Sequence, residues 1–128
     1  MKRSMAMVLA GLVSTTSPAA FAAELIMFEE VGCGWCRLWL MEVEPGYGKS
    51  REGSLAPLRR LPLSKAQTSG IALNSPVTGT PTFVLVDASR EIGRISGYPG
   101  AEFFYPMLED LLQRLPPAAN ATTSGTQH

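Results

Sequence analysis

Two cysteines, Cys33 and Cys36, carry the chemistry that this chain can perform, and two residues separate them. A pair with this spacing binds a metal, attaches a haem or forms a redox-active disulfide. A structural zinc site or an all-cysteine iron–sulfur cluster needs four ligands, and the only other candidate is His128 near the C-terminus. A c-type haem needs a histidine directly after the second cysteine, where this chain has Arg37. The pair is therefore expected to act as a dithiol or disulfide that needs no cofactor.

Both cysteines stand where a strand is expected to turn into a helix. The apolar run 25–28 predicts a buried strand, and the apolar residues of 38–43 predict a helical segment that ends near Pro45. Free N–H groups at a helix N-terminus stabilise a thiolate, so Cys33 is the expected nucleophile, with a pKa lowered to roughly 3.5–7.5. Cys36 would resolve the mixed disulfide. A purely structural disulfide is the alternative, although so short a loop restricts the unfolded chain little.

The middle of the chain has weaker signals. Segment 44–57 is rich in Gly, Ser, Lys, Arg and Glu, and it predicts an exposed connection with one short helical turn. Residues 58–63 predict a second strand, and residues 64–69 predict a short helix or turn.

The C-terminal half predicts a hairpin and a helix. Pro81 directly precedes a β-branched apolar run, 82–87, which is typical of a central strand, and 92–96 is its expected hairpin partner. Apolar residues at helical spacing over 103–115 predict an amphipathic helix that Pro106 should kink or divide into two pieces. The predicted order of elements is β-α-β followed by β-β-α.

The two ends of the chain have the composition of processed or unstructured segments. Residues 1–22 have two basic residues, a short apolar run and an Ala-Phe-Ala site, which predict a cleavable export signal; an uncleaved N-terminal anchor is the alternative. The remaining chain has nine basic and eleven acidic side chains, a formal charge of −2, which argues against nucleic-acid binding. A single domain is expected over 23–115, followed by a disordered tail over 116–128.

Several of these features together resemble the thioredoxin superfamily. They are the Cys33–Cys36 motif between strand and helix, a Thr80–Pro81 pair about 45 residues later, the hairpin, and a Gly97 turn before the last helix. The resemblance covers 25–115 and implies a compact α/β thioredoxin-like fold, with a central mixed four-stranded sheet flanked by helices. Within the superfamily, segments 33–39, 52–60 and 97–104 are most similar to the exported periplasmic thioredoxin of the bacterial sulfur-oxidising (Sox) system.

The resemblance implies roles for three residues around the cysteines. Pro81 would form a cis peptide bond and face the cysteine pair, whereas an ordinary trans proline at a strand end is the alternative. The backbone at Thr80 would pair with an extended substrate segment. Trp35, between the cysteines, is expected to be an exposed docking surface, while Trp39 on the helix is expected in the core.

The chain departs from cytosolic thioredoxins at positions that matter for proton transfer and potential. Met27 stands where they carry a buried Asp that accepts a proton. Glu30 is then a candidate partner in proton transfer, unless Glu29 and Glu30 are simply solvated charges. Trp35 replaces the proline of the Gly-Pro pair of strong reductants, so we expect a potential above thioredoxin's value of about −270 mV.

The expected function is that of a periplasmic thiol–disulfide oxidoreductase, monomeric, whose partner is a disulfide-bearing protein. The Sox resemblance implies a reductant for a sulfur-carrier protein, supplied with electrons by a membrane thiol reductase. A general periplasmic oxidant or isomerase, a persulfide carrier, and a binding module with a permanent disulfide are the alternatives. Arg37, Arg59 and Arg60 form either a basic rim for an anionic partner or a solvated edge.

Overall fold

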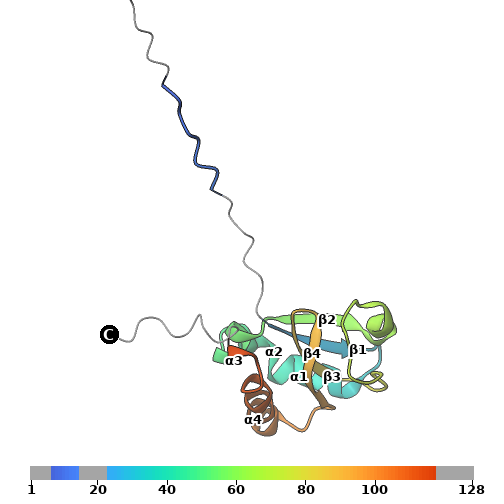
Figure 1. The fold of residues 1–128 in the computed structure, drawn as a ribbon. Coiled ribbons are helices and arrows are strands. Elements are labelled where there is room, and N and C mark those ends of the chain that lie inside the picture. The colour runs from blue at the N-terminus through green and yellow to red at the C-terminus, as the bar shows by residue number, and fades with distance from the viewer. Residues whose placement is uncertain (1–6, 15–22, 118–128) are drawn as a thin grey trace, which may run out of the picture.

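The computed structural model describes residues 7–14 and 23–117 (Figure 1). Most of the predicted export signal and nearly all of the predicted tail lie outside the described residues, so both remain predictions. Among the described residues, no helix combines the length and the apolar character needed to cross a bilayer.

A mixed four-stranded sheet forms the centre of the fold, in the order β2-β1-β3-β4 (Figure 1). Strand β1 pairs in parallel with β2, whereas the β1–β3 and β3–β4 pairs are antiparallel. The inner strands β1 and β3 are buried on both faces, which is why their sequences are continuous apolar runs. The predicted α/β class and mixed sheet are confirmed. The strands are β1 (Glu24–Glu29), β2 (Leu58–Pro62), β3 (Thr82–Asp87) and β4 (Arg90–Ser96).

Helices cover one face of the sheet, and a 3-10 helix with an irregular segment covers the other. Apolar side chains of α1 and α4 join those of the sheet in the larger core. Ala66 and Val77 close the second, smaller core over β1 and β3. The helical elements are α1 (Gly34–Glu42), α2 (Glu44–Tyr47), α3 (Arg51–Leu55), the 3-10 helix η1 (Leu63–Thr68) and α4 (Ala101–Leu112).

Trp39 anchors α1 to the sheet. Its side chain is fully buried, as predicted, and its ring centroid lies 5.0 Å from that of Phe83 on β3 and 5.6 Å from that of Phe104 on α4. Tilted and edge-on aromatic pairs at these separations stabilise a core beyond their buried area. The packing of Trp39 therefore fixes the helix whose first turn carries both cysteines.

The segment 44–57 is mostly exposed, as its composition predicts, but it has more helix than the single turn expected and three of its residues are buried. It forms two short helices, α2 and α3, and Tyr47 is buried against Trp39. The Tyr47 hydroxyl donates a 2.7 Å hydrogen bond to the carbonyl of Ala56. Gly53 packs so closely that a Cβ there would lie 1.9 Å from the carbonyl oxygen of Tyr47. One aromatic anchor and one close glycine contact thus fold a polar stretch onto the core.

Pro106 was expected to kink the last helix or to divide it into two pieces; α4 is one piece, so the helix is not divided, and the kink stays a prediction. Pro106 lies inside α4 on its exposed side, and the missing N–H removes one backbone bond, to the carbonyl of Glu102. Burial of Phe104 and Leu108 on the opposite side outweighs that loss. Phe103, although it fits the apolar pattern, is exposed.

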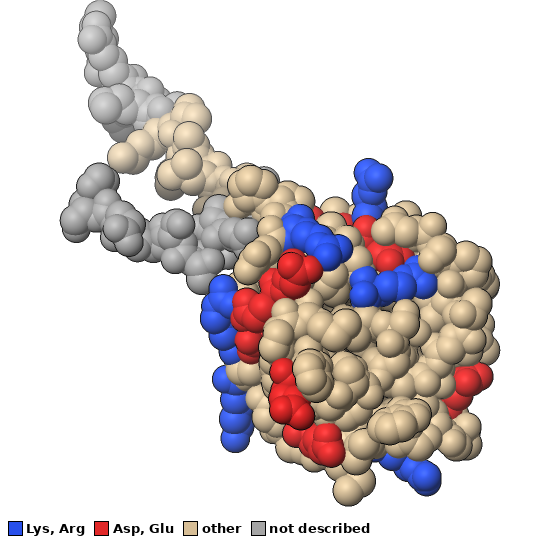
Figure 2. Space-filling view, turned by 90° about the horizontal axis from the view of Figure 1, so that it is seen from below, with Lys and Arg blue, Asp and Glu red and all other residues tan. Residues whose placement is uncertain are grey.

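The surface carries charges of both signs. Figure 2 shows basic and acidic side chains close together around a broad uncharged area. Exposed ion pairs join Arg51 to Glu109 at 2.6 Å and Arg114 to Asp110 at 2.7 Å.

Candidate functional site

A disulfide joins Cys33 to Cys36 at the N-terminus of α1. Cys33 is the N-cap residue, and its Sγ accepts a 3.1 Å hydrogen bond from the backbone N–H of Cys36. Cys33 is half-buried, whereas Cys36 is 3% exposed. Cys33 is therefore the more accessible of the two cysteines to a partner in solution. In the reduced protein, the same N–H and the positive end of the helix dipole favour a Cys33 thiolate.

A tight turn after β1 sets the position of Cys33. The Cys33 N–H donates to the carbonyl of Glu30 at 3.2 Å, and Gly32 between them has φ +84°. Residues other than glycine rarely adopt this backbone conformation. The strand, the glycine turn and the N-cap thus deliver Cys33 to the molecular surface at the end of the central sheet.

The Thr80–Pro81 pair lies beside this turn, although 46 residues separate Thr80 from Cys33 in the sequence. The Thr80 hydroxyl donates to Glu30 Oε2 at 3.2 Å. The Thr80–Pro81 peptide bond is cis, and Pro81 is buried directly before β3, where its carbonyl accepts from the Gly97 N–H at 2.7 Å. The structure thereby joins the two segments that the sequence marked as functional.

Apolar side chains stand on both sides of Cys33. Trp35, in the first turn of α1, is 62% exposed, as predicted. Val31, in the turn before Cys33, is fully exposed, although no motif of the sequence indicated it. An apolar residue in a short polar turn directly before the cysteine motif is the signal that could have found it.

A groove of about 430 Å³ runs beside the disulfide and reaches both cysteines. Two of its charged residues neutralise each other, because Arg60 binds both carboxylate oxygens of Glu29 at 2.9 Å through one nitrogen. Glu30 and Arg37 also line the groove, and in residues 7–14 and 23–117 neither has an ion-pair partner within 4.0 Å.

Only part of the predicted basic rim can therefore bind an anionic partner. Arg59 pairs with Glu24 at 2.7 Å, and Arg60 pairs with Glu29, so their charges are satisfied within the protein. Arg37 is exposed and lies at the groove next to the disulfide. An anionic group that enters the groove meets Arg37 as its cation.

The buried side of the disulfide is apolar. Met27 is fully buried in the same cluster as Cys36, at the position where the thioredoxin resemblance would place an acid. Arg60 holds Glu29, whereas Glu30 is the carboxylate of the groove that has no ion-pair partner among the described residues. In the described part of the chain, no three potential ligands gather at a metal site.

Comparison with solved structures identifies relatives of this arrangement. The chain is similar to the periplasmic thioredoxin SoxS from Paracoccus pantotrophus in its reduced form, with 44% identity and a TM-score of 0.70 over 73% of this chain and 99% of that one. It has the fold of a thioredoxin from Malassezia sympodialis, Mala s 13, at 17% identity and a TM-score of 0.52, over 73% and 77% of the two chains. Neither the protein-family models nor the curated proteins that were compared match the chain. On the likeness to SoxS, and with a disulfide at the N-terminus of α1, the chain belongs to the thioredoxin family and is a thiol–disulfide oxidoreductase.

Proposed function

We propose that this protein works in the periplasm, where it reduces a disulfide of a partner protein, and that the partner is a sulfur-carrier protein of sulfur oxidation. The observation that carries the proposal is an accessible Cys33 paired with a buried Cys36 in a chain 44% identical to a periplasmic Sox thioredoxin. The predicted export signal agrees with this location.

The reaction follows from the different exposure of the two sulfurs. The Cys33 thiolate attacks one sulfur of the partner's disulfide, and the other sulfur leaves as a thiolate and takes a proton. Cys36 then loses its proton and attacks Cys33 Sγ, which releases the second thiol of the partner and forms the Cys33–Cys36 disulfide. Two electrons pass to the partner, and a membrane thiol reductase returns two electrons to the oxidised protein. Glu30 is the proposed acceptor of the Cys36 proton.

Three further residues are proposed to hold the partner. The backbone at Thr80 would pair with an extended segment next to the partner's cysteine. Pro81 would shape that surface, and Trp35 would supply an apolar contact beside Cys33.

The decisive experiment traps the mixed disulfide. Cys36→Ser, expressed with its N-terminal segment in the native host, should accumulate a small set of proteins bound to Cys33, to be separated on non-reducing gels and identified by mass spectrometry. The matched control is the double variant Cys33→Ser/Cys36→Ser, in which every adduct should disappear. A sulfur-carrier protein among the adducts supports the proposed partner. A complete lack of adducts, with the wild-type disulfide resistant to reductant, would contradict the proposal.

The direction of electron flow has its own measurement. A titration of the Cys33–Cys36 pair against glutathione gives its reduction potential. A potential close to the roughly −120 mV of a strong periplasmic oxidant would replace reduction by oxidation as the function.

A further inference from the structure

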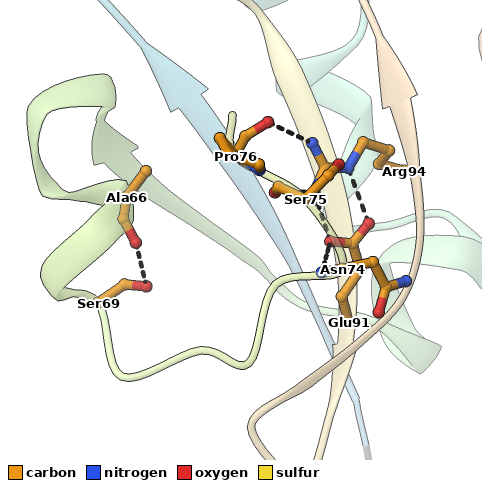
Figure 3. Close-up of polar contacts among 7 residues, drawn as sticks. All are labelled: Ala66, Ser69, Asn74, Ser75, Pro76, Glu91 and Arg94. Carbon is orange, nitrogen blue, oxygen red and sulfur yellow. Dashed lines mark hydrogen bonds and ion pairs between the residues drawn. The ribbon is translucent and has the colours of Figure 1, made fainter. Parts of the chain in front are cut away.

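A buried glutamate and a half-buried arginine form an ion pair on β4 (Figure 3). The Glu91 side chain is 2% exposed and that of Arg94 is 18% exposed. Arg94 donates from Nε to Glu91 Oε2 at 2.7 Å and from Nη2 to Oε1 at 2.6 Å. Together these two residues are called the clamp below. Nothing in the proposed chemistry at Cys33 uses them.

A β-bulge brings the two side chains of the clamp to one face of the sheet. In a regular strand, residues three apart point to opposite faces. Here the register shifts between Leu85 and Val86, so that Glu91 pairs with Val86 and Arg94 pairs with Val84, with Ile92 as the extra residue. Val84 and Val86 both belong to the smaller core, and the clamp lies over that same face.

The clamp binds the backbone of the segment that crosses this face. The N–H of Asn74 donates to Glu91 Oε1 at 2.9 Å. Arg94 donates to the carbonyl of Ser75 at 2.7 Å and to that of Pro76 at 3.2 Å (Figure 3). Three consecutive residues are thus held through their main chain by two side chains.

The held segment leads directly to Thr80. After Pro76, Val77 is buried in the smaller core, and residues 78–79 are exposed. From Thr82 onward the ladder of β3 with β1 and β4 holds the chain. Thr80 and Pro81 therefore lie between the clamp on one side and the sheet on the other. The bonds of Thr80 to Glu30 and of Pro81 to Gly97 hold them in addition.

We propose that the clamp positions the backbone at Thr80 for pairing with the partner protein, an inference that rests on the proposed function. Apolar side chains would cover this face of the sheet as well, because replacing a buried ion pair by apolar residues is often neutral or stabilising. What the ion pair adds is a fixed orientation of the backbone that it binds. The planar guanidinium of Arg94 fixes two carbonyls and one carboxylate in a single geometry, which a flexible apolar contact does not do.

The test compares a protein substrate, which would pair with the Thr80 backbone, with a small disulfide that cannot. Arg94→Lys keeps the charge opposite Glu91 but loses the fork that reaches both carbonyls. We expect its KM for the reduction of insulin to rise about tenfold with kcat nearly unchanged, because a displaced binding element weakens positioning. The rate with bis(2-hydroxyethyl) disulfide, which is too small to pair with a backbone, should stay within about twofold of wild type. Hydrogen exchange at the amides of Val77 and Thr80 should become faster.

Two control variants distinguish positioning from general stability. Arg114→Lys alters an exposed ion pair on α4 and should change neither substrate. Leu115→Ala removes a buried side chain of the larger core, on the other face of the sheet from the clamp, so it should lower stability without raising KM. The double variant Glu91→Gln/Arg94→Gln, which is neutral and can still hydrogen-bond internally, should repeat the effect of Arg94→Lys if the single variant folds poorly.

The results distinguish a failure of this inference from a failure of the proposed function. An unchanged KM for insulin in a folded clamp variant would overturn the inference. So would an equal loss of rate with both substrates, or a matching rise of KM in Leu115→Ala. A wild-type protein that reduces neither substrate would instead refute the proposed function.

Discussion

Gly53→Ala should destabilise the protein strongly although the position lies in a polar, glycine-rich stretch. The added Cβ would lie 1.9 Å from the carbonyl oxygen and 2.7 Å from the carbonyl carbon of Tyr47, where real Cβ atoms keep about 3.0 Å or more. Both contacts are backbone atoms, so α2 and α3 must separate by about 1 Å. That movement loosens the Tyr47 hydroxyl from the Ala56 carbonyl. Overpacking of this kind costs about 2 kcal/mol of unfolding free energy.

The assay is urea denaturation followed by the fluorescence of Trp35 and Trp39, together with a thermal scan. A loss of about 2 kcal/mol corresponds to a fall in Tm of roughly 8–16 °C for a domain of this size. Gly48→Ala is the matched control, because that position has φ −63° and ψ −20° and open space around its would-be Cβ. It should stabilise the protein by about 0.4–1 kcal/mol through the unfolded state. Equal stabilities of the two variants would refute the packing of α3 on Tyr47.

Three further outcomes are expected. Arg37→Glu should slow the reaction with oxidised glutathione by about fivefold relative to neutral bis(2-hydroxyethyl) disulfide, and high salt should remove the difference; a salt-independent loss would refute a charge effect. Burial alone raises the pKa of Glu91, but the hydrogen bonds from Arg94 and Asn74 and the Arg94 charge outweigh it and lower that pKa. The ionised Glu91 should thus contribute fully to the free energy of unfolding above its unfolded pKa of about 4.3, and this contribution should be lost as pH falls through the lower pKa of the folded state. The urea midpoint should therefore fall less steeply with decreasing pH in Glu91→Gln than in wild type. The same slope in both proteins would contradict this. Glu30→Gln should slow the release of the mixed disulfide more than its formation in stopped-flow traces, whereas equal effects on both steps would exclude proton transfer by Glu30.

The redox pair and the inner sheet could be predicted from the sequence because their signals are local. The cysteine spacing and the lack of further ligands selected a disulfide, and the structure has that disulfide at a helix N-terminus. Continuous apolar runs correctly predicted β1 and β3, since strands buried on both faces need apolar side chains at every position. Trp39 was correctly placed in the core.

Elements held by a few distant contacts were predicted poorly. Segment 44–57 has the composition of a loop, and the contacts of Tyr47 with Trp39 and Ala56 that fold it have no periodic pattern. In α4, Pro106 does not divide the helix, because burial of the opposite side outweighs the lost backbone bond. Local propensity is a weak guide where tertiary packing supplies most of the free energy.

Neighbouring residues along the chain thus specified the kind of chemistry, because a thiol pair and its helix need only a short segment. Pairing between distant segments decided which charges are available around that chemistry. Arg60 is neutralised by Glu29 across β1 and β2, so that Arg37 is left as the accessible cation of the groove. The clamp exists only because a bulge in β4, where it pairs with β3, turns Glu91 and Arg94 to the same face of the sheet. The register of two strands depends on both segments, so neither segment alone predicts it.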